Sequence, residues 1–284
     1  MPEQAQVHAD QVAYWNGEGG ARWVARQAHT DVMLAPVADA LIAHAAPRPD
    51  DRVLDIGCGC GVTTLLLAAA VPRGHVTGLD VSAPMLAVAE ARGDRPPNVA
   101  WLLADAATHG FGRGAFDLLV SRFGVMFFGD PIAAFANLRG AAGPGGRLVF
   151  ACWRPLRENG WMEVPLRAAE ACVPPLPPPE PHAPGPFAFA DPDRVAAILT
   201  GAGWAKPEFT RLDVALDIAA GKGLEAAVEQ ATHVGGAARL LTNAAHAAQA
   251  AARDAIRAAL AAHATRDGRV LLPGAVWLVT SRMG

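Results

Sequence analysis

Lysine is nearly absent from this sequence of 284 residues, which contains only Lys206 and Lys222. Arginine therefore supplies nearly all of the positive charge, and the 24 Lys and Arg residues are outnumbered by 27 Asp and Glu, for a net charge of −3. Binding to a phosphate backbone depends on an excess of basic side chains. The composition therefore argues against a nucleic acid as a partner.

Long apolar runs and a leader-like start are also missing. No segment approaches about 18 uninterrupted apolar residues, the length that a membrane-spanning helix needs. Residues 1–20 contain no basic stretch followed by an apolar run. We expect a cytoplasmic protein that neither crosses nor binds a membrane.

Cysteine is sparse, and its spacing is uninformative for metal binding. The four residues are Cys58, Cys60, Cys152 and Cys172. The first two are separated by one residue, unlike a C-x-x-C pair, and no histidine pair follows at zinc-finger spacing. We expect free, reduced thiols and no bound metal.

Apolar residues make up 52% of the chain and charged residues 18%, enough for a core in one large domain or two small ones. From about residue 52 to 153, short runs rich in β-branched residues or leucine alternate with turns and helical patterns. This alternation predicts an α/β fold with a parallel sheet, which binds ligands at the carboxyl ends of its strands. The runs are 52–56, 75–80, 99–105, 116–121 and 146–152, and the helical patterns are 62–70, 83–92 and 131–141.

Helical sequence precedes this unit, from about residue 8 to 48. Residues 174–186 contain eight prolines, which forbid a regular helix and predict an extended segment, either an inert linker or a lid beside the site. The remaining predicted elements are a helix from 191 to about 201, a strand at 209–218, alanine-rich helix at 223–264 and a last strand at 271–282.

The sharpest motif is Asp55-Ile56-Gly57-Cys58-Gly59-Cys60-Gly61, between a predicted strand and a predicted helix. Glycines there permit positive φ angles and a close approach of a ligand to the backbone. The loop has neither the Gly-Lys-Ser/Thr of a P-loop nor the G-x-G-x-x-G spacing of dinucleotide-binding proteins. Because Asp55 would repel a pyrophosphate and attract an ammonium group, the pattern favours a nucleoside ligand that carries positive charge.

Two further acids close the next predicted strands. Asp80 ends the second strand, where a carboxylate can accept hydrogen bonds from both ribose hydroxyls. Asp105 ends the third, where it can accept from the exocyclic amine of adenine. Each acid alone is compatible with a turn or a helix cap. Three acids at adjacent strand ends, in phase with a glycine loop, favour a nucleoside site.

Taken together and in order, five segments resemble the class I S-adenosylmethionine-dependent methyltransferases. They are similar, more narrowly, to the bacterial small-molecule branch that includes the quinone-biosynthesis C-methyltransferases. The segments are VLDIGCGCG, VTGLDVSAPML, LLADAATHGF, FDLLVSRFGVMFF and GGRLVFACW. The resemblance implies a Rossmann-like, doubly wound sheet of order 3-2-1-4-5-7-6 with strand seven antiparallel. It also implies S-adenosylmethionine as cofactor and S-adenosylhomocysteine as product.

The resemblance implies a role for individual residues as well. Asp55 would help hold the amino-acid end of the cofactor, Asp80 the ribose hydroxyls, and Asp105 the adenine. Aromatic side chains of an N-terminal helix would close over the cofactor, where their faces can contact the sulfonium. The implied cofactor-binding set is Asp55, Gly57, Gly59, Gly61, Asp80, Val81, Met85, Asp105, Ala106, Ser121, Tyr14 and Trp23.

The same resemblance divides the chain into segments. Residues 1–48 would form an N-terminal helical cap over the cofactor, and residues 49–153 the cofactor-binding α/β core. The rest would comprise a Pro-rich lid insertion at 154–187, a core helix and strand six at 188–218, a helical cap insertion at 219–268 and strand seven at 269–284.

The loop after the fourth strand, Ser121 to Phe128, bears on the acceptor. It lacks the Asn-Pro-Pro-aromatic motif of adenine- and glutamine-modifying relatives and the acidic ligands of metal-dependent ones. Its Phe and Met residues favour an apolar or aromatic acceptor, although they would equally suit packing under the next helix. No catalytic residue stands out. The weak candidates are His29, His109 and Arg122, and Arg122 would either orient an anionic acceptor group or pair with Asp31 or Asp130.

We therefore expect a methyltransferase that moves a methyl group to an O, N or C atom of a small acceptor by in-line displacement. Alignment of donor and acceptor supplies much of such catalysis, so a general base is needed only for a protonated acceptor. Two alternatives stay open: a non-methylating or non-enzymatic S-adenosylmethionine-binding protein and, less favoured, a nicotinamide-dependent oxidoreductase. A homodimer is compatible with the sequence.

Overall fold

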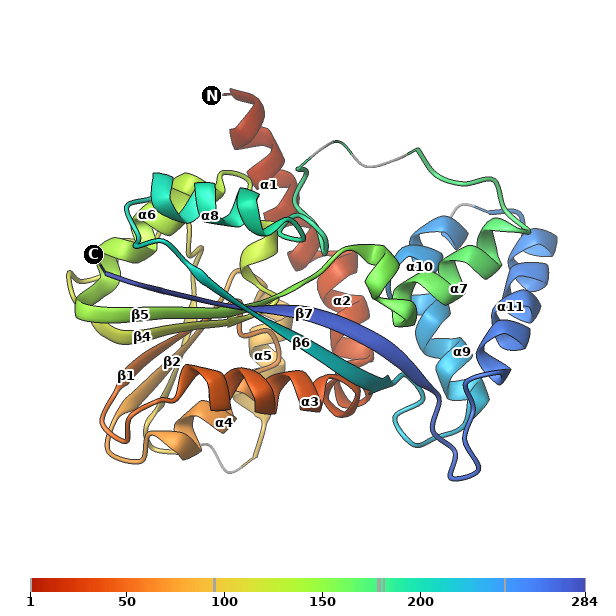
Figure 1. Ribbon diagram of the computed structural model, residues 1–284, viewed down its shortest axis with the longest axis horizontal. Coiled ribbons are helices and arrows are strands. Elements are labelled where there is room, and N and C mark those ends of the chain that lie inside the picture. The colour runs from red at the N-terminus through yellow and green to blue at the C-terminus, as the bar shows by residue number, and fades with distance from the viewer. Residues whose placement is uncertain (1, 94–95, 178–179, 181, 243, 284) are drawn as a thin grey trace.

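The computed structural model describes residues 2–93, 96–177, 180, 182–242 and 244–283. Its seven strands form one sheet in the order β3-β2-β1-β4-β5-β7-β6 (Figure 1). β7 is antiparallel to β5 and β6, and the other neighbouring strands are parallel. This topology confirms the predicted fold. The strands are β1 (Arg52–Ile56), β2 (His75–Asp80), β3 (Val99–Leu103), β4 (Phe116–Arg122), β5 (Ala142–Trp153), β6 (Glu208–Asp217) and β7 (Leu271–Arg282).

Helices cover both faces of this sheet. Figure 1 shows α3 (Gln27–Ala45) and α4 (Val62–Ala70) below it, with α6 (Pro131–Ala141) and α8 (Pro192–Gly201) above it. α5 (Ala83–Ala91) packs against β2 and β3. Local sequence starts several of these helices: Ser82, Asp130 and Asp191 are N-caps that accept a backbone N–H, each followed closely by a proline.

A second group of helices lies beyond one end of β6 and β7. It consists of α7 (Gly160–Glu170), α9 (Leu224–His233), α10 (Gly236–Leu241) and α11 (His246–Ala261), and we call it the cap. In the view of Figure 1, the N-terminal helix α1 (Pro2–Asn16) lies above the strands, and α2 (Glu18–Ala25) lies nearer to the cap. Short 3₁₀ turns occur at Val125–Phe127 and Leu156–Glu158. Buried apolar side chains of the cap and of the sheet belong to one continuous core.

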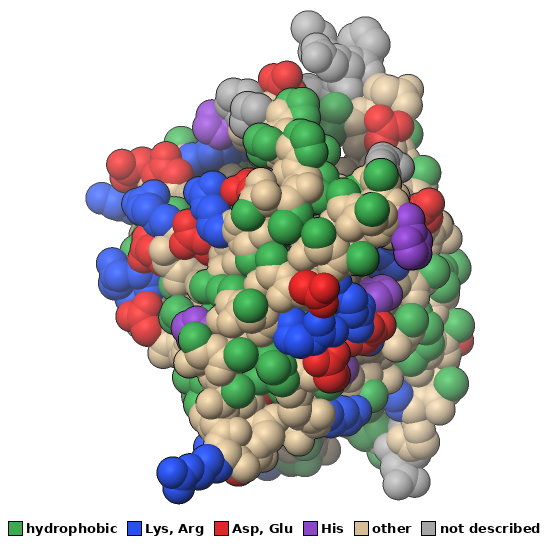
Figure 2. Space-filling model, turned by 90° about the vertical axis from the view of Figure 1, so that its right-hand side faces the viewer, with side chains coloured by type: hydrophobic (Ala, Val, Ile, Leu, Met, Phe, Trp, Pro, Cys, Tyr) green, Lys and Arg blue, Asp and Glu red, His purple; other side chains and the backbone are tan. Residues whose placement is uncertain are grey.

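The outer face of the cap carries both signs of charge side by side (Figure 2). Arg257 pairs with Glu225 at 2.7 Å and with Asp254 at 2.5 Å. Arg253 pairs with Glu229 at 3.0 Å. Among the described helices, none is long and apolar enough to span a bilayer.

Three expectations about element boundaries are wrong. The alanine-rich stretch 223–264 is not one helix, because the chain breaks after His233 at two glycines and again before α11, which gives α9, α10 and α11. β5 begins at Ala142 and not at residue 146, because an irregularity in its pairing with β4 takes up Gly143 to Gly146. β3 ends at Leu103, so Asp105 follows the strand by two residues.

Candidate functional site

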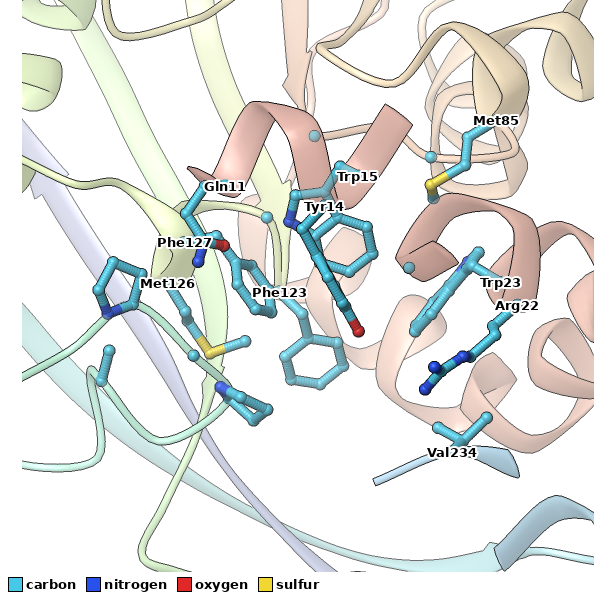
Figure 3. A pocket seen from close by; sticks show the side chains of 18 of the residues that line it. Gln11, Tyr14, Trp15, Arg22, Trp23, Met85, Phe123, Met126, Phe127 and Val234 are labelled. Atoms are coloured by element: carbon cyan, nitrogen blue, oxygen red, sulfur yellow. The ribbon is translucent and has the colours of Figure 1, made fainter. Parts of the chain in front are cut away.

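A cavity of about 1000 Å³ opens at the carboxyl ends of β1, β2 and β4. Its walls come from the glycine loop, from α1 and α2, from the loop after β4, from the start of α10, and from residues 176, 177, 180 and 182–188 of the proline-rich segment. Figure 3 shows its interior, with Tyr14 and Trp15 above, Phe123 at the centre and Trp23 at one side. Most segments that the sequence singled out therefore meet at one place.

The glycine loop brings backbone close to the cavity. Gly57 has φ 67° and Gly59 has φ 57°, angles that other residues rarely adopt. A Cβ on Gly57 would lie 2.8 Å from the Cα of Gly124, and one on Gly59 would lie 2.9 Å from Cε of Met85. Both glycines line the cavity, as does Met85. Gly61 does not, because it starts α4 and packs on the ring of Trp101.

Asp55 lies beneath this loop and is almost completely buried. Its Oδ2 accepts a hydrogen bond from Thr64 Oγ1 at 2.6 Å, and its Oδ1 has no partner among the described residues. Burial raises the pKa of Asp55 to about 6. The side chain does not line the cavity and lies below the glycine loop.

Asp80 joins β2 to the glycine loop and does line the cavity. Its Oδ2 accepts from the Gly59 N–H at 2.7 Å, and its Oδ1 accepts from the Ser82 N–H at 2.8 Å. Burial raises the pKa of this carboxyl. Each carboxylate oxygen has two lone pairs, so both keep capacity for a ligand hydroxyl. Val81 lines the cavity beside it.

Asp105 and Ala106 also line the cavity, and Asp105 has a partner that sequence analysis missed. Its Oδ2 lies 2.6 Å from His8 Nε2 and accepts from Thr108 Oγ1 at 3.0 Å, while its Oδ1 accepts from the Ala107 N–H. No local signal in the sequence marks His8, because the pair joins residues 97 positions apart.

Ser121, in contrast, is fully buried and faces away from the cavity. Its Oγ donates to the Ile56 carbonyl at 2.7 Å and accepts from the Gly124 N–H at 3.1 Å. It thus ties the end of β1 to the loop after β4, and it is absent from the cavity lining.

The end of α1 is fixed to the turn after β2. The Ser82 hydroxyl donates to the Trp15 carbonyl at 2.6 Å. Asn16 donates to the Val81 carbonyl at 3.0 Å and accepts from the Ala83 N–H at 3.0 Å. These three hydrogen bonds fix the end of α1, whose Tyr14 and Trp15 line the cavity together with Trp23 of α2 (Figure 3).

An aromatic wall lies across the cavity from the glycine loop. Phe123 has φ 68°, and its ring stacks on Trp153 with centroids 4.1 Å apart and planes 9° apart. The ring centroid of Trp161 lies 5.0 Å from that of Trp153. A positive φ strains the backbone of a bulky residue, and the stacking of the Phe123 ring on Trp153 offsets this strain energy. The resemblance covered Trp153, but nothing in the sequence pointed to Trp161 of α7.

The three weak catalytic candidates occupy different places. His29 is buried, its Nε2–H donates to the Ile218 carbonyl at 2.9 Å, and burial lowers its pKa. His109 contacts the ring of Phe111 edge-on. Neither lines the cavity, whereas Arg122 does. Asp31 pairs with Arg92 at 2.6 Å and Asp130 caps α6, so neither forms an ion pair with Arg122. No cluster of metal-ligating side chains occurs in the described ranges.

Comparisons with known proteins agree with this arrangement. Residues 53–146 match a family described as a methyltransferase domain. The demethylmenaquinone methyltransferase of Thermus thermophilus is 38% identical over 106 residues, which are 37% of this chain and 48% of that protein. The aklanonic acid methyltransferase DauC of a Streptomyces species is 34% identical over 118 residues, 40% of this chain and 54% of that protein. The chain thus spans about half the length of these curated relatives.

A solved structure shows the same fold at lower identity. It is phosphoethanolamine N-methyltransferase 2 of Haemonchus contortus in complex with S-adenosyl-L-methionine. The TM-score is 0.52 at 17% sequence identity, and the match covers 88% of this chain and 53% of that chain.

Proposed function

We propose that the chain is an S-adenosylmethionine-dependent methyltransferase that transfers the cofactor's methyl group to a small, apolar or aromatic acceptor, in line with the matched methyltransferase domain and the similar methyltransferases. The observation that carries this proposal is the buried Asp80 carboxylate, which faces the cavity and is held against the glycine loop by the Gly59 N–H. A nucleoside with a positively charged tail fits such a site better than a phosphate does.

The residues present are suited to S-adenosylmethionine. Gly57 and Gly59 line the cavity with their backbone, and a Cβ on either would collide with Gly124 or Met85, so the absence of side chains lets a ligand approach the loop backbone. Asp80 has lone pairs for the ribose hydroxyls. Asp55, below the loop, contributes negative charge near the amino-acid end without a cation of its own in hydrogen-bonding contact.

We assign the adenine to the space beside Asp105 and Ala106. In the ligand-free protein, His8 and Thr108 both contact Oδ2 of Asp105, and only the Ala107 N–H contacts Oδ1. Oδ1 therefore retains a lone pair for an exocyclic amine. His8 would brace the carboxylate from α1, which makes the N-terminal helix part of the cofactor site.

The bound cofactor supplies a methyl group on a sulfonium, which is already activated for displacement. The protein's part is then to align the acceptor and exclude water. Tyr14, Trp15 and Trp23 form one side of the cavity, and the Phe123–Trp153 stack forms the other. Flat apolar walls of this kind suit an apolar or aromatic acceptor, and both curated relatives are named for small-molecule acceptors.

Calorimetry and a product assay test the proposal. We expect S-adenosylhomocysteine to bind in a 1:1 ratio, and we expect its release from S-adenosylmethionine when a panel of phenols, quinols, amines and carbonyl-activated carbon acids is screened. Failure to bind the cofactor would reject the assignment. Tight binding without turnover across the panel would favour the non-methylating alternative, and binding of NADH in its place would favour an oxidoreductase.

A further inference from the structure

Arg122 is a cation at the cavity, and none of the described acidic side chains forms an ion pair with it. It is the last residue of β4 and lines the cavity. One of its terminal guanidinium nitrogens is buried without a hydrogen-bond partner, and no ion pair of Arg122 occurs among the described residues. Burial accordingly lowers the pKa of this guanidinium. A buried charge in proteins normally has a partner.

The position of Arg122 follows from the sheet. Val120 of β4 is in register with Asp55 of β1, so the two side chains leave the sheet on the same face. Arg122, two residues further along, points to that face as well. This places its guanidinium on the side of α3 and the glycine loop, where Asp31 and Asp55 both attract it.

Neither acid nearby satisfies it. Asp31 Oδ2 already accepts a hydrogen bond from the Arg92 guanidinium at 2.6 Å and another from the Gln27 side-chain amide. Asp55 gives one oxygen to Thr64 and has its pKa raised to about 6 by burial. The Asp31–Arg92 pair is neutral overall, and no hydrogen bond joins Asp55 to Arg122 among the described residues, so the guanidinium keeps donors for a ligand in this part of the cavity.

A second unsatisfied group lines the same cavity. Thr30, next to Asp31 on α3, is buried, and its hydroxyl has no hydrogen-bond partner among the described residues. A guanidinium fork supplies two donors and a hydroxyl one, and the two oxygens of a carboxylate can accept from all three.

We propose that Arg122, assisted by Thr30, is a carboxylate-binding site in the cavity. The carboxylate has two sources: the α-carboxylate at the amino-acid end of the cofactor, or an acid group on the acceptor. The inference rests on the proposed function, because both sources presuppose that this cavity holds cofactor and acceptor. It does not require knowledge of the acceptor's identity.

The test uses Arg122→Met, Arg122→Lys and Thr30→Val, with Arg113→Met as a control. Arg113 is exposed and lies outside the cavity. Calorimetry on each variant measures affinity for S-adenosylhomocysteine, for its analogue without the α-carboxylate, and for 2-naphthoate against neutral 2-naphthamide. Thermal melting checks that each variant is folded, and Arg122→Lys, which keeps the charge but loses the fork, serves if Arg122→Met does not fold.

If the cofactor's carboxylate is the ligand, Arg122→Met weakens S-adenosylhomocysteine binding about 10- to 100-fold and leaves the analogue unchanged. If the acceptor's acid is the ligand, S-adenosylhomocysteine binding is unchanged and the preference for naphthoate over naphthamide is lost. Thr30→Val weakens binding of the same carboxylate-bearing probe, but by less than Arg122→Met does. The proposal is overturned if Arg122→Met binds all four probes as the wild type does, if it weakens S-adenosylhomocysteine and the analogue equally, or if the wild type shows neither dependence.

Failure of the proposed function gives a different pattern. In that case the wild type does not bind S-adenosylhomocysteine at all. The naphthoate preference, measured without cofactor, still decides whether Arg122 binds a carboxylate.

Discussion

Asp80 is the residue on which the cofactor assignment depends most directly. We expect Asp80→Ala to weaken S-adenosylhomocysteine binding by about 1 to 3 kcal/mol, because charge-assisted hydrogen bonds are lost. Asp80→Asn, which keeps one acceptor oxygen, should lose less. Calorimetry measures both, with exposed Glu90→Gln on α5 as the control. Unchanged affinity in Asp80→Ala would contradict the ribose assignment.

The raised pKa of Asp55 predicts that the stability of the fold depends on pH. Its folded pKa of about 6 lies above the usual value of 3.8, so the folded state holds the proton more tightly than the unfolded chain. The stabilisation that this provides is present at low pH and is lost as pH rises through about 6.

We therefore expect the free energy of unfolding of the wild type, relative to Asp55→Asn, to fall by roughly 2 kcal/mol between about pH 4.5 and 7.5. Urea unfolding at several pH values measures this difference. Asp80, whose pKa burial also raises, is present in both proteins, so its contribution cancels. A difference that does not change with pH would show that Asp55 titrates normally.

Site residues could be predicted from the sequence where a local pattern of strand ends and glycines fixes their place in the fold. Asp80 and Gly57 follow from strand ends and from glycines that must adopt positive φ. His8 and Trp161 do not, because their roles come from contacts between distant segments, and such contacts leave no local pattern. Ser121 lies in β4 and not in the loop after it, and its hydroxyl binds the carbonyl at the end of β1 and does not line the cavity.

At the scale of secondary-structure elements, two of the hydrogen bonds at the end of α1 can be deleted by a single substitution. Asn16→Ala deletes two of the three hydrogen bonds described above between the end of α1 and the turn after β2. Each such bond contributes about 0.5–1.5 kcal/mol, so if α1 closes over the cofactor, S-adenosylhomocysteine should dissociate faster by about 5-fold or more. Stopped-flow fluorescence can follow dissociation, since Trp15 and Trp23 line the cavity.

Gln6→Ala is the matched control for this experiment. Gln6 is also on α1, but it bonds only to Asp10 of the same helix at 2.8 Å. Equal dissociation rates in Asn16→Ala and Gln6→Ala would argue that α1 does not limit release of the cofactor.

Prediction succeeded for elements with clear ends and failed for those without them. Helices α4 and α6 and strands β1, β2 and β7 begin and end as expected, because glycine, proline or an N-cap residue marks their limits. The stretch 223–264 is so rich in alanine that Gly235 and Gly236 do not divide it in the prediction. In the structure the chain breaks at these glycines and again before α11, and α9, α10 and α11 each pack against α7.

At the scale of the whole molecule, cap and sheet are not independent units. Their buried apolar residues form one core, and the cavity lies where they meet the N-terminal helices. The described residues of the proline-rich segment, 174–177, 180 and 182–186, contain no helix or strand, and turns or bends occur at 182 and 184–186. Gly185 donates to the Met126 carbonyl at 3.1 Å, and several of the prolines line the cavity. The sequence left open whether this segment is a linker or a lid.

A same-length replacement of residues 174–186 by Gly and Ser distinguishes these roles. If the prolines hold the segment over the acceptor, a flexible substitute should lower turnover with the acceptor found in the release assay and leave S-adenosylhomocysteine affinity unchanged. The control is a Gly/Ser replacement of residues 265–268, a turn outside the cavity. Unchanged turnover would identify an inert linker. Loss of turnover and affinity together would mean that the contact between residue 185 and the loop after β4 is needed for the fold of the site itself.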